Sequence, residues 1–138
     1  MIIQKNKRVV VTGLGLVTPL GIGVQPTWES LCAGKSGVGE ITRFDCSDYA
    51  TKIAAEVKDF KARDFMSKKD ARRVELFIAY ALAATRMAIE DSGLVIDRTN
   101  EMRVGTITGC GLGGLRFMED TVLRVAEEGP KWVSPFFI

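Results

Sequence analysis

The chain has 138 residues, 46% of them hydrophobic and 26% charged, which is typical of a globular domain with a hydrophobic core. Its formal net charge of +2 is too small to indicate nucleic-acid binding, so a basic binding site would have to be local. It has no histidine, three widely spaced cysteines and no apolar run near the roughly 20 residues that span a bilayer. We therefore expect a cytoplasmic chain with no disulfide framework, no metal and no membrane span.

The first expected element is a buried strand over residues 8–12, because Arg-Val-Val-Val-Thr is a short β-branched run. Residues 13–15 (Gly-Leu-Gly) then turn the chain, and Pro19 excludes a regular helix directly after them. Pro26 suits the first turn of a short helix over residues 27–33, which would bury Cys32 and end at Gly34. After this helix we expect a loop over residues 34–37 and an irregular segment over residues 41–48. A weak edge strand over residues 53–57 and a second loop over residues 58–66 would follow.

The longest helix is expected over residues 68–91. Residues 67–70 (Ser-Lys-Lys-Asp) have the form of a capping box at its start, and Ser92-Gly93 would end it. Its alanines make it slim enough for close packing against a sheet or another helix. Residues at three- and four-residue steps predict a core-facing stripe: Val74, Phe77, Ile78, Ala81, Leu82, Thr85 and Ala88.

A glycine-rich loop follows a second β-branched run. Residues 104–108 are expected to form a buried strand, four glycines stand between residues 109 and 114, and an amphipathic helix runs from Leu115 to about Glu127. Gly129-Pro130 would close that helix. Since only glycine lets other atoms come so close to the backbone, this arrangement is typical of a ligand-approach point.

The order of these elements predicts α/β layering with at least partly parallel strands. Three strands make a thin sheet, which suggests part of a larger domain. The sequence also ends in an apolar stretch that would form an exposed patch, so we expect the natural chain to continue. That stretch contains Trp132, Phe136, Phe137 and Ile138.

Two other functions can be drawn from the glycine loop. Gly109, Gly111 and Gly114 satisfy the dinucleotide-binding pattern, but Glu127 and Glu128, which have about the spacing of a ribose ligand, fall on the expected helix. Cys110 could be a nucleophile, but the chain offers no histidine as its base. We favour neither reading.

Three motifs in order carry a resemblance to the β-ketoacyl-[acyl-carrier-protein] synthases, and most of all to the elongating synthase II type. They are residues 7–21, residues 109–115 (Gly-Cys-Gly-Leu-Gly-Gly-Leu) and residues 134–137 (Ser-Pro-Phe-Phe). The resemblance covers essentially the whole chain. A chance match to all three motifs in order is much less probable than a chance match to one.

The resemblance implies that residues 1–138 are the N-terminal part of a thiolase-like fold, which is a layered αβαβα structure when complete and forms a homodimer through missing and C-terminal segments. It implies decarboxylative Claisen condensation of malonyl-carrier protein with a cysteine-bound acyl chain, with no cofactor. The catalytic cysteine and both histidines of the family would lie beyond this chain. We therefore expect no catalytic residue here and no condensation by these residues alone; a non-enzymatic pairing fragment is the alternative.

The resemblance also implies two binding regions. Gly111 and Leu112 would line the acyl-chain tunnel, where Leu112 would limit chain length, and Phe137 and Ile138 would line it across the dimer interface. The local basic cluster would dock the acidic acyl carrier protein by electrostatic steering. Its residues are Lys69, Arg72 and Arg73, which share one face at helical spacing, with Lys131 beside them.

Overall fold

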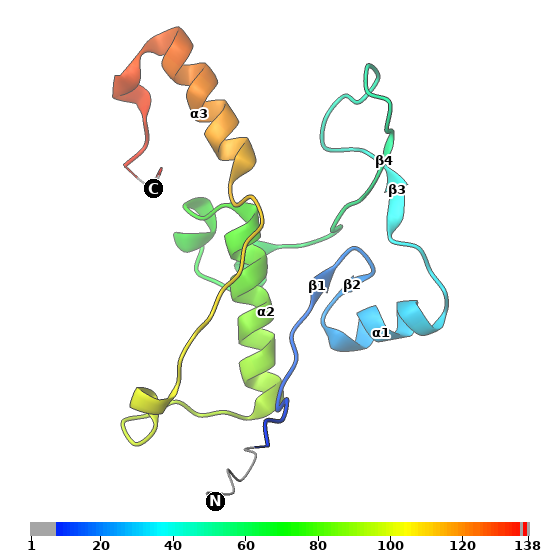
Figure 1. The fold of residues 1–138 in the computed structure, drawn as a ribbon, viewed down its shortest axis with the longest axis vertical. Helices are drawn as coiled ribbons and strands as arrows, with labels where there is room; N and C mark the ends of the chain where they lie inside the picture. Colours follow the sequence, from blue (N-terminus) through cyan, green and yellow to red (C-terminus); the bar gives the residue numbers. More distant parts are fainter. Residues whose placement is uncertain (1–7, 136, 138) are drawn as a thin grey trace, which may run out of the picture. The chain divides into compact units, whose positions relative to one another are not determined.

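The computed structural model describes residues 8–135 and 137, whose helices and strands are labelled in Figure 1. These residues divide into two compact units. The first unit contains residues 8–58 and 84–95, and the second contains the other described residues from 59 onward. The longest helix, α2 (Leu76–Ser92), belongs to both units: its residues 76–83 lie in the second unit and its residues 84–92 in the first.

The first unit begins with a small hairpin that leads into helix α1. Strands β1 (Val17–Thr18) and β2 (Gly21–Ile22) pair antiparallel, and α1 spans Val24–Cys32. The buried Thr27 hydroxyl lies 3.1 Å from the Thr18 hydroxyl and donates to the carbonyl of Gly21 at 3.2 Å, and so ties the helix to the hairpin. The helix starts three residues before the expected position, because Pro26 is tolerated anywhere in a first turn. Cys32 is exposed, so its predicted burial is wrong.

A second hairpin holds a tightly bonded loop. Strands β3 (Val38–Glu40) and β4 (Ile53–Ala55) pair antiparallel. Strand β4 confirms the strand expected over residues 53–57, although it ends at Ala55, and β3 was not predicted. The Glu56 carboxylate accepts the Thr42 hydroxyl at 2.6 Å and the amides of Thr42 and Arg43 at 3.1 and 3.3 Å. The irregular segment between the strands is therefore closed at its base by one side chain.

Two glycines let the chain lie directly on α2 (Leu76–Ser92). A Cβ on Gly15 would stand 1.9 Å from the Ala84 carbonyl oxygen, and one on Gly13 would stand 2.2 Å from that of Ala88. The Leu14 amide donates to the Asp91 carboxylate at 2.9 Å. The predicted close packing of the alanine-rich helix is confirmed, although its partner here is an extended segment.

The second unit is built around short helical turns, the first part of α2 and helix α3 (Leu115–Glu128). Helix α3 ends where Gly129 adopts a φ of 89°, as the sequence predicts. The single-turn 3-10 helices span Ala62–Asp64, Asp70–Arg72, Glu101–Arg103 and Pro130–Trp132.

The start of the long helix differs from the prediction. Residues 70–72 form a separate 3-10 turn, and α2 begins only at Leu76. Like charges four residues apart destabilise a helix, and Lys68–Arg72 and Lys69–Arg73 are two such pairs. The predicted stripe is also wrong in part, because Phe77, Ala81, Leu82 and Thr85 are exposed and the fully buried positions are Ala79 and Ala83.

Two predicted strands do not form. Residues 8–12 and 104–108 lie in no strand, and side chains such as Val9 and Ile107 are 93% and 100% exposed. Strand pairs among the described residues are the two antiparallel hairpins, so the parallel pairing expected from the element order is not found there. A β-branched run needs a neighbouring strand to supply its hydrogen bonds.

Candidate functional site

A short positively charged turn lies in the second unit, between the helical turn Ala62–Asp64 and the start of α2. Residues 68–73, which we call the basic turn, carry Lys69, Arg72 and Arg73, all of them exposed. The Ser67 hydroxyl accepts the Asp70 amide at 3.1 Å and lies 2.6 Å from the Asp70 carboxylate. Of the predicted capping box, the bond from the Asp70 amide to the Ser67 hydroxyl forms, but it lies at this turn and not at the start of the long helix.

Aromatic residues hold the chain just before the basic turn. The Phe60 ring stacks on Phe65 with centroids 5.6 Å apart and meets Tyr80 of α2 edge-on at 4.8 Å. We call these three residues the aromatic cluster. Sequence reasoning missed it because residues 58–66 mix charges and aromatic rings without a clear period; the signal was the presence of aromatic residues on both sides of a basic run.

The glycine loop opens to solvent at its centre and is packed at its end. A Cβ on Gly111 would meet nothing within 4 Å, and Leu112 is 79% exposed. At the other end, a Cβ on Gly114 would lie 3.2 Å from Glu75 Cγ, and one on Gly113 would lie 3.7 Å from the Phe77 ring. The loop is thus fixed against the start of α2 where it enters α3.

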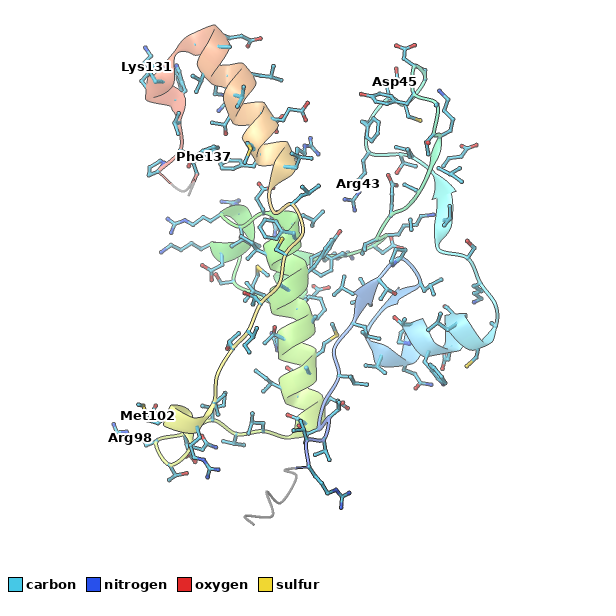
Figure 2. All side chains as sticks on the ribbon, in the orientation of Figure 1. Arg43, Asp45, Arg98, Met102, Lys131 and Phe137 are labelled. Carbon is cyan, nitrogen blue, oxygen red and sulfur yellow. The ribbon has the colours of Figure 1, made fainter. Side chains whose placement is uncertain are left out.

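The segment after α3 folds back onto that helix. Phe137 lies beside α3, its ring centroid 5.9 Å from that of Phe117 (Figure 2). The Lys131 ammonium stands 5.9 Å from the centroid of the neighbouring Trp132 ring. Ile138 lies outside the described residues, so its predicted role has no structural description.

The structure groups some of the predicted site residues. Lys69, Arg72 and Arg73 fall within one turn, and Gly111 shares its loop with Leu112, whereas Lys131 lies in a separate turn after α3. Within the described residues, no three or more histidine, cysteine, aspartate or glutamate side chains gather as a metal site would require.

The family model of the β-ketoacyl synthase N-terminal domain matches residues 6–138. The chain belongs to this family. The β-ketoacyl synthase assignment agrees with the three motifs and confirms the predicted N-terminal α/β segment of a thiolase-like fold.

Curated relatives support the same assignment. The chain is 46% identical over 135 residues to the 3-oxoacyl-[acyl-carrier-protein] synthase 2 of Vibrio cholerae, a match covering 98% of this chain and 33% of the relative. The Coxiella burnetii enzyme of the same name is 47% identical, with the same coverage. The β-ketoacyl synthase segment described here thus spans about a third of the length of these relatives.

Solved structures give the same fold. The ishigamide ketosynthase/chain length factor superposes with a TM-score of 0.74 at 29% identity, covering 93% of this chain and 32% of that one. A type II PKS ketosynthase, in complex with its acyl-carrier protein and bound to the hexaketide, gives 0.75 at 27% identity, covering 95% of this chain and 34% of that one.

The two other readings of the glycine loop gain nothing from the structure. The strand that a dinucleotide site needs before Gly109 does not form, and Glu127 and Glu128 lie in the last turn of α3. Cys110 is exposed in a chain without histidine. As for membranes, none of the helices in the described part of the chain combines the length and apolar character that crossing would need.

Proposed function

We propose that the protein carrying this chain is a 3-oxoacyl-[acyl-carrier-protein] synthase, which elongates fatty acyl chains by decarboxylative Claisen condensation. The observation that carries the proposal is the 46% identity to an enzyme of that name across 98% of this chain. In this reaction malonyl-carrier protein loses carbon dioxide, and the resulting carbanion displaces a cysteine thiolate from the acyl thioester. The product is a 3-oxoacyl-carrier protein.

In this proposal the chain docks the acyl carrier protein and lines the acyl tunnel, and it carries no catalytic residue. The reaction needs a cysteine nucleophile and histidines that polarise the thioester, and these 138 residues contain no histidine. We therefore expect the intact protein to condense its substrates and the chain alone to be inactive. A homodimer and a cytoplasmic location are part of the same proposal.

The basic turn is proposed to dock the acyl carrier protein. Lys69, Arg72 and Arg73 are exposed within one turn, and opposite charge on a partner would steer the encounter. The type II PKS ketosynthase similar to this chain was solved in complex with its acyl-carrier protein, which supports this kind of partner. Lys131 is proposed as a second contact.

The glycine loop and the segment after α3 are proposed to line the acyl tunnel. Gly111 leaves its side open, and Leu112 offers an exposed aliphatic side chain that an alkyl chain could cover. Burial of each CH₂ group contributes about 0.8 kcal/mol, enough to select among chain lengths. Phe137, with its proposed neighbour Ile138, would add apolar surface.

One experiment tests the proposed activity. The intact protein is mixed with acyl- and malonyl-carrier protein, and 3-oxoacyl product is followed by mass spectrometry together with carbon dioxide release. We expect product from the intact protein and none from the 138-residue chain. Absence of product over a series of acyl chain lengths, with correctly folded intact protein, would overturn the proposal.

The docking surface is tested separately by salt and charge. We expect carrier-protein affinity to weaken as ionic strength rises, and Arg72→Gln to weaken it at low salt. Arg98→Gln, a matched loss of one exposed arginine outside the basic turn, should leave the affinity unchanged. Affinity that does not depend on salt would contradict docking through this turn.

A further inference from the structure

We propose that the aromatic cluster is a positioning device for the basic turn. Phe60, Phe65 and Tyr80 would hold the turn in its docking geometry and thereby raise the affinity for the acidic carrier protein without touching it. The inference rests on the proposed docking function, and it assigns to these rings a role in partner binding beyond that of local packing.

The rings close a loop that contains the basic turn. Phe60 and Phe65 precede the turn and Tyr80 follows it on the second turn of α2, yet the Phe60 and Tyr80 rings meet at 4.8 Å and 82°. Phe60 also stacks on Phe65 at 5.6 Å and 4°. Phe60 is thus the central ring, and its two contacts tie the entry of the loop to a rigid helix.

The backbone is bent at the point where the loop begins. Asp59, directly before Phe60, has a φ of 58°, and in the described part of the chain it is the one non-glycine residue with positive φ. A left-handed conformation costs free energy outside glycine and persists where surrounding contacts hold it. The contacts of the Phe60 ring are such a restraint.

The loop is also stiff inside. The Ala71 amide donates to the Ser67 carbonyl at 2.9 Å, the Val74 amide donates to the Asp70 carbonyl at 3.1 Å, and Ser67 and Asp70 bond through their side chains. A turn that is bonded internally and anchored at both ends moves as one body. Loosening the aromatic anchor would free that whole body.

The physical consequence is an ordering cost at binding. A mobile basic turn must be fixed when it docks, and the lost freedom lowers affinity, whereas a turn already held in place avoids this cost. The aromatic cluster carries no charge, so its loss leaves the number of ion pairs and hence the salt dependence of binding unchanged. The salt dependence of binding therefore distinguishes a residue that positions the basic turn from a residue whose charge contacts the partner.

The test uses the intact protein and compares Phe60→Leu with Phe60→Tyr and Arg72→Gln. We expect Phe60→Leu to raise the KM for malonyl-carrier protein about three- to tenfold at unchanged kcat, with an unchanged salt slope. Phe60→Tyr keeps the ring and should stay within about twofold of wild type. Arg72→Gln should raise KM and also reduce the salt slope.

A carrier-free substrate distinguishes positioning from general stability. Condensation of acyl and malonyl thioesters of pantetheine does not use the docking surface, so Phe60→Leu should leave its rate unchanged. A parallel loss with both substrate types would assign the rings to the core alone and overturn the proposal. If Phe60→Leu does not fold, Tyr80→Leu removes the same contact from the other side; where both fold, their effects should be less than additive.

The remaining outcomes separate this inference from the proposed function. A wild-type KM in Phe60→Leu, together with a raised KM in Arg72→Gln, would overturn the positioning role and leave docking intact. A wild-type KM in both variants would overturn docking through the basic turn, and the positioning role with it.

Discussion

At the scale of single residues, Leu112 is the side chain on which the proposed chain-length selection depends. It is 79% exposed on an open glycine loop, so nothing in the described part of the chain competes with an alkyl chain for its surface. We expect Leu112→Trp in the intact protein to block long acyl chains, because the larger ring fills the space that their last carbons need.

Rates of enzyme acylation across a series of acyl chain lengths measure this effect. Long-chain acylation should fall by at least about tenfold, the equivalent of two buried CH₂ groups, while short chains react as before. Leu112→Ile, a change of shape at constant volume, is the control and should keep the wild-type profile. Unchanged long-chain acylation in Leu112→Trp would contradict the tunnel assignment.

Glu56 is the residue whose ionisation should control the irregular loop between β3 and β4. The Thr42 hydroxyl and the amides of Thr42 and Arg43 donate to its carboxylate and lower its pKa. A carboxylate whose pKa is lowered by folding stabilises the folded state above its ordinary pKa. That contribution is lost as the pH falls through the lower folded-state value.

The expected outcome is therefore loosening of residues 42–56 at acidic pH, with a midpoint below the ordinary pKa of glutamate. The amide proton resonance of Thr42, followed by NMR during an acid titration, reports it. Glu56→Gln should abolish the titration, and Glu40→Gln on β3 should leave it intact. A midpoint at or above the ordinary value would show that these hydrogen bonds do not favour the charged form.

At the scale of elements, Gly13 and Gly15 approach α2 more closely than any other glycine in the described part of the chain approaches its neighbours. A methyl group on Gly15 would need to occupy the position of the Ala84 carbonyl, and backbone atoms cannot rotate away as a flexible side chain can. We expect Gly15→Ala to lower the free energy of unfolding by about 1–3 kcal/mol or more, the range for overpacked sites.

Chemical denaturation of the intact protein measures this change. Gly39→Ala is a matched control, since a Cβ there would meet its nearest atom, Lys58 Nζ, at an ordinary 3.9 Å. It should shift stability by less than about 0.5 kcal/mol. Equal stability of the Gly15 and Gly39 variants would contradict the close approach.

The same elements show what could be read from sequence. The end of α3 was predictable because Gly129 and Pro130 act locally, and Gly93, with φ of 64°, ends α2 for the same reason. The buried face of α2 was not, because the predicted stripe left out Ala79 and Ala83, which are its buried positions, and included the exposed Phe77 and Leu82. The break before Leu76 depends on repulsion between charges, which apolar periodicity does not report.

The candidate site, too, could be predicted from the sequence only in part. The sequence spacing places Lys69, Arg72 and Arg73 on one face of the long helix, whereas the structure has them exposed in a separate turn before α2. The position of the aromatic cluster does not follow from spacing, because Phe60 and Tyr80 lie twenty residues apart in the chain and their rings meet only in the tertiary structure. Long-range contacts of this kind depend on tertiary structure that a local pattern does not encode.

At the scale of the whole molecule, two β-branched runs lack partner strands in the described residues. Val9 and Val11 are 93% and 79% exposed, and Ile107 is fully exposed. The match to the ishigamide ketosynthase/chain length factor covers 93% of this chain but only 32% of that structure. Since soluble proteins rarely leave such apolar runs uncovered, we expect the intact protein to pair and bury both.

Hydrogen exchange of the intact protein tests this expectation segment by segment. Amides of residues 8–12 and 104–108 should exchange slowly, because strand pairing and burial remove them from water, whereas the exposed residues 50 and 51, which lie in no helix or strand, serve as a fast-exchanging reference. In the 138-residue chain alone, both runs should exchange as fast as that reference. Fast exchange of both runs in the intact protein would mean that neither is a strand there, and that the β-branched pattern alone does not form a sheet in this family member.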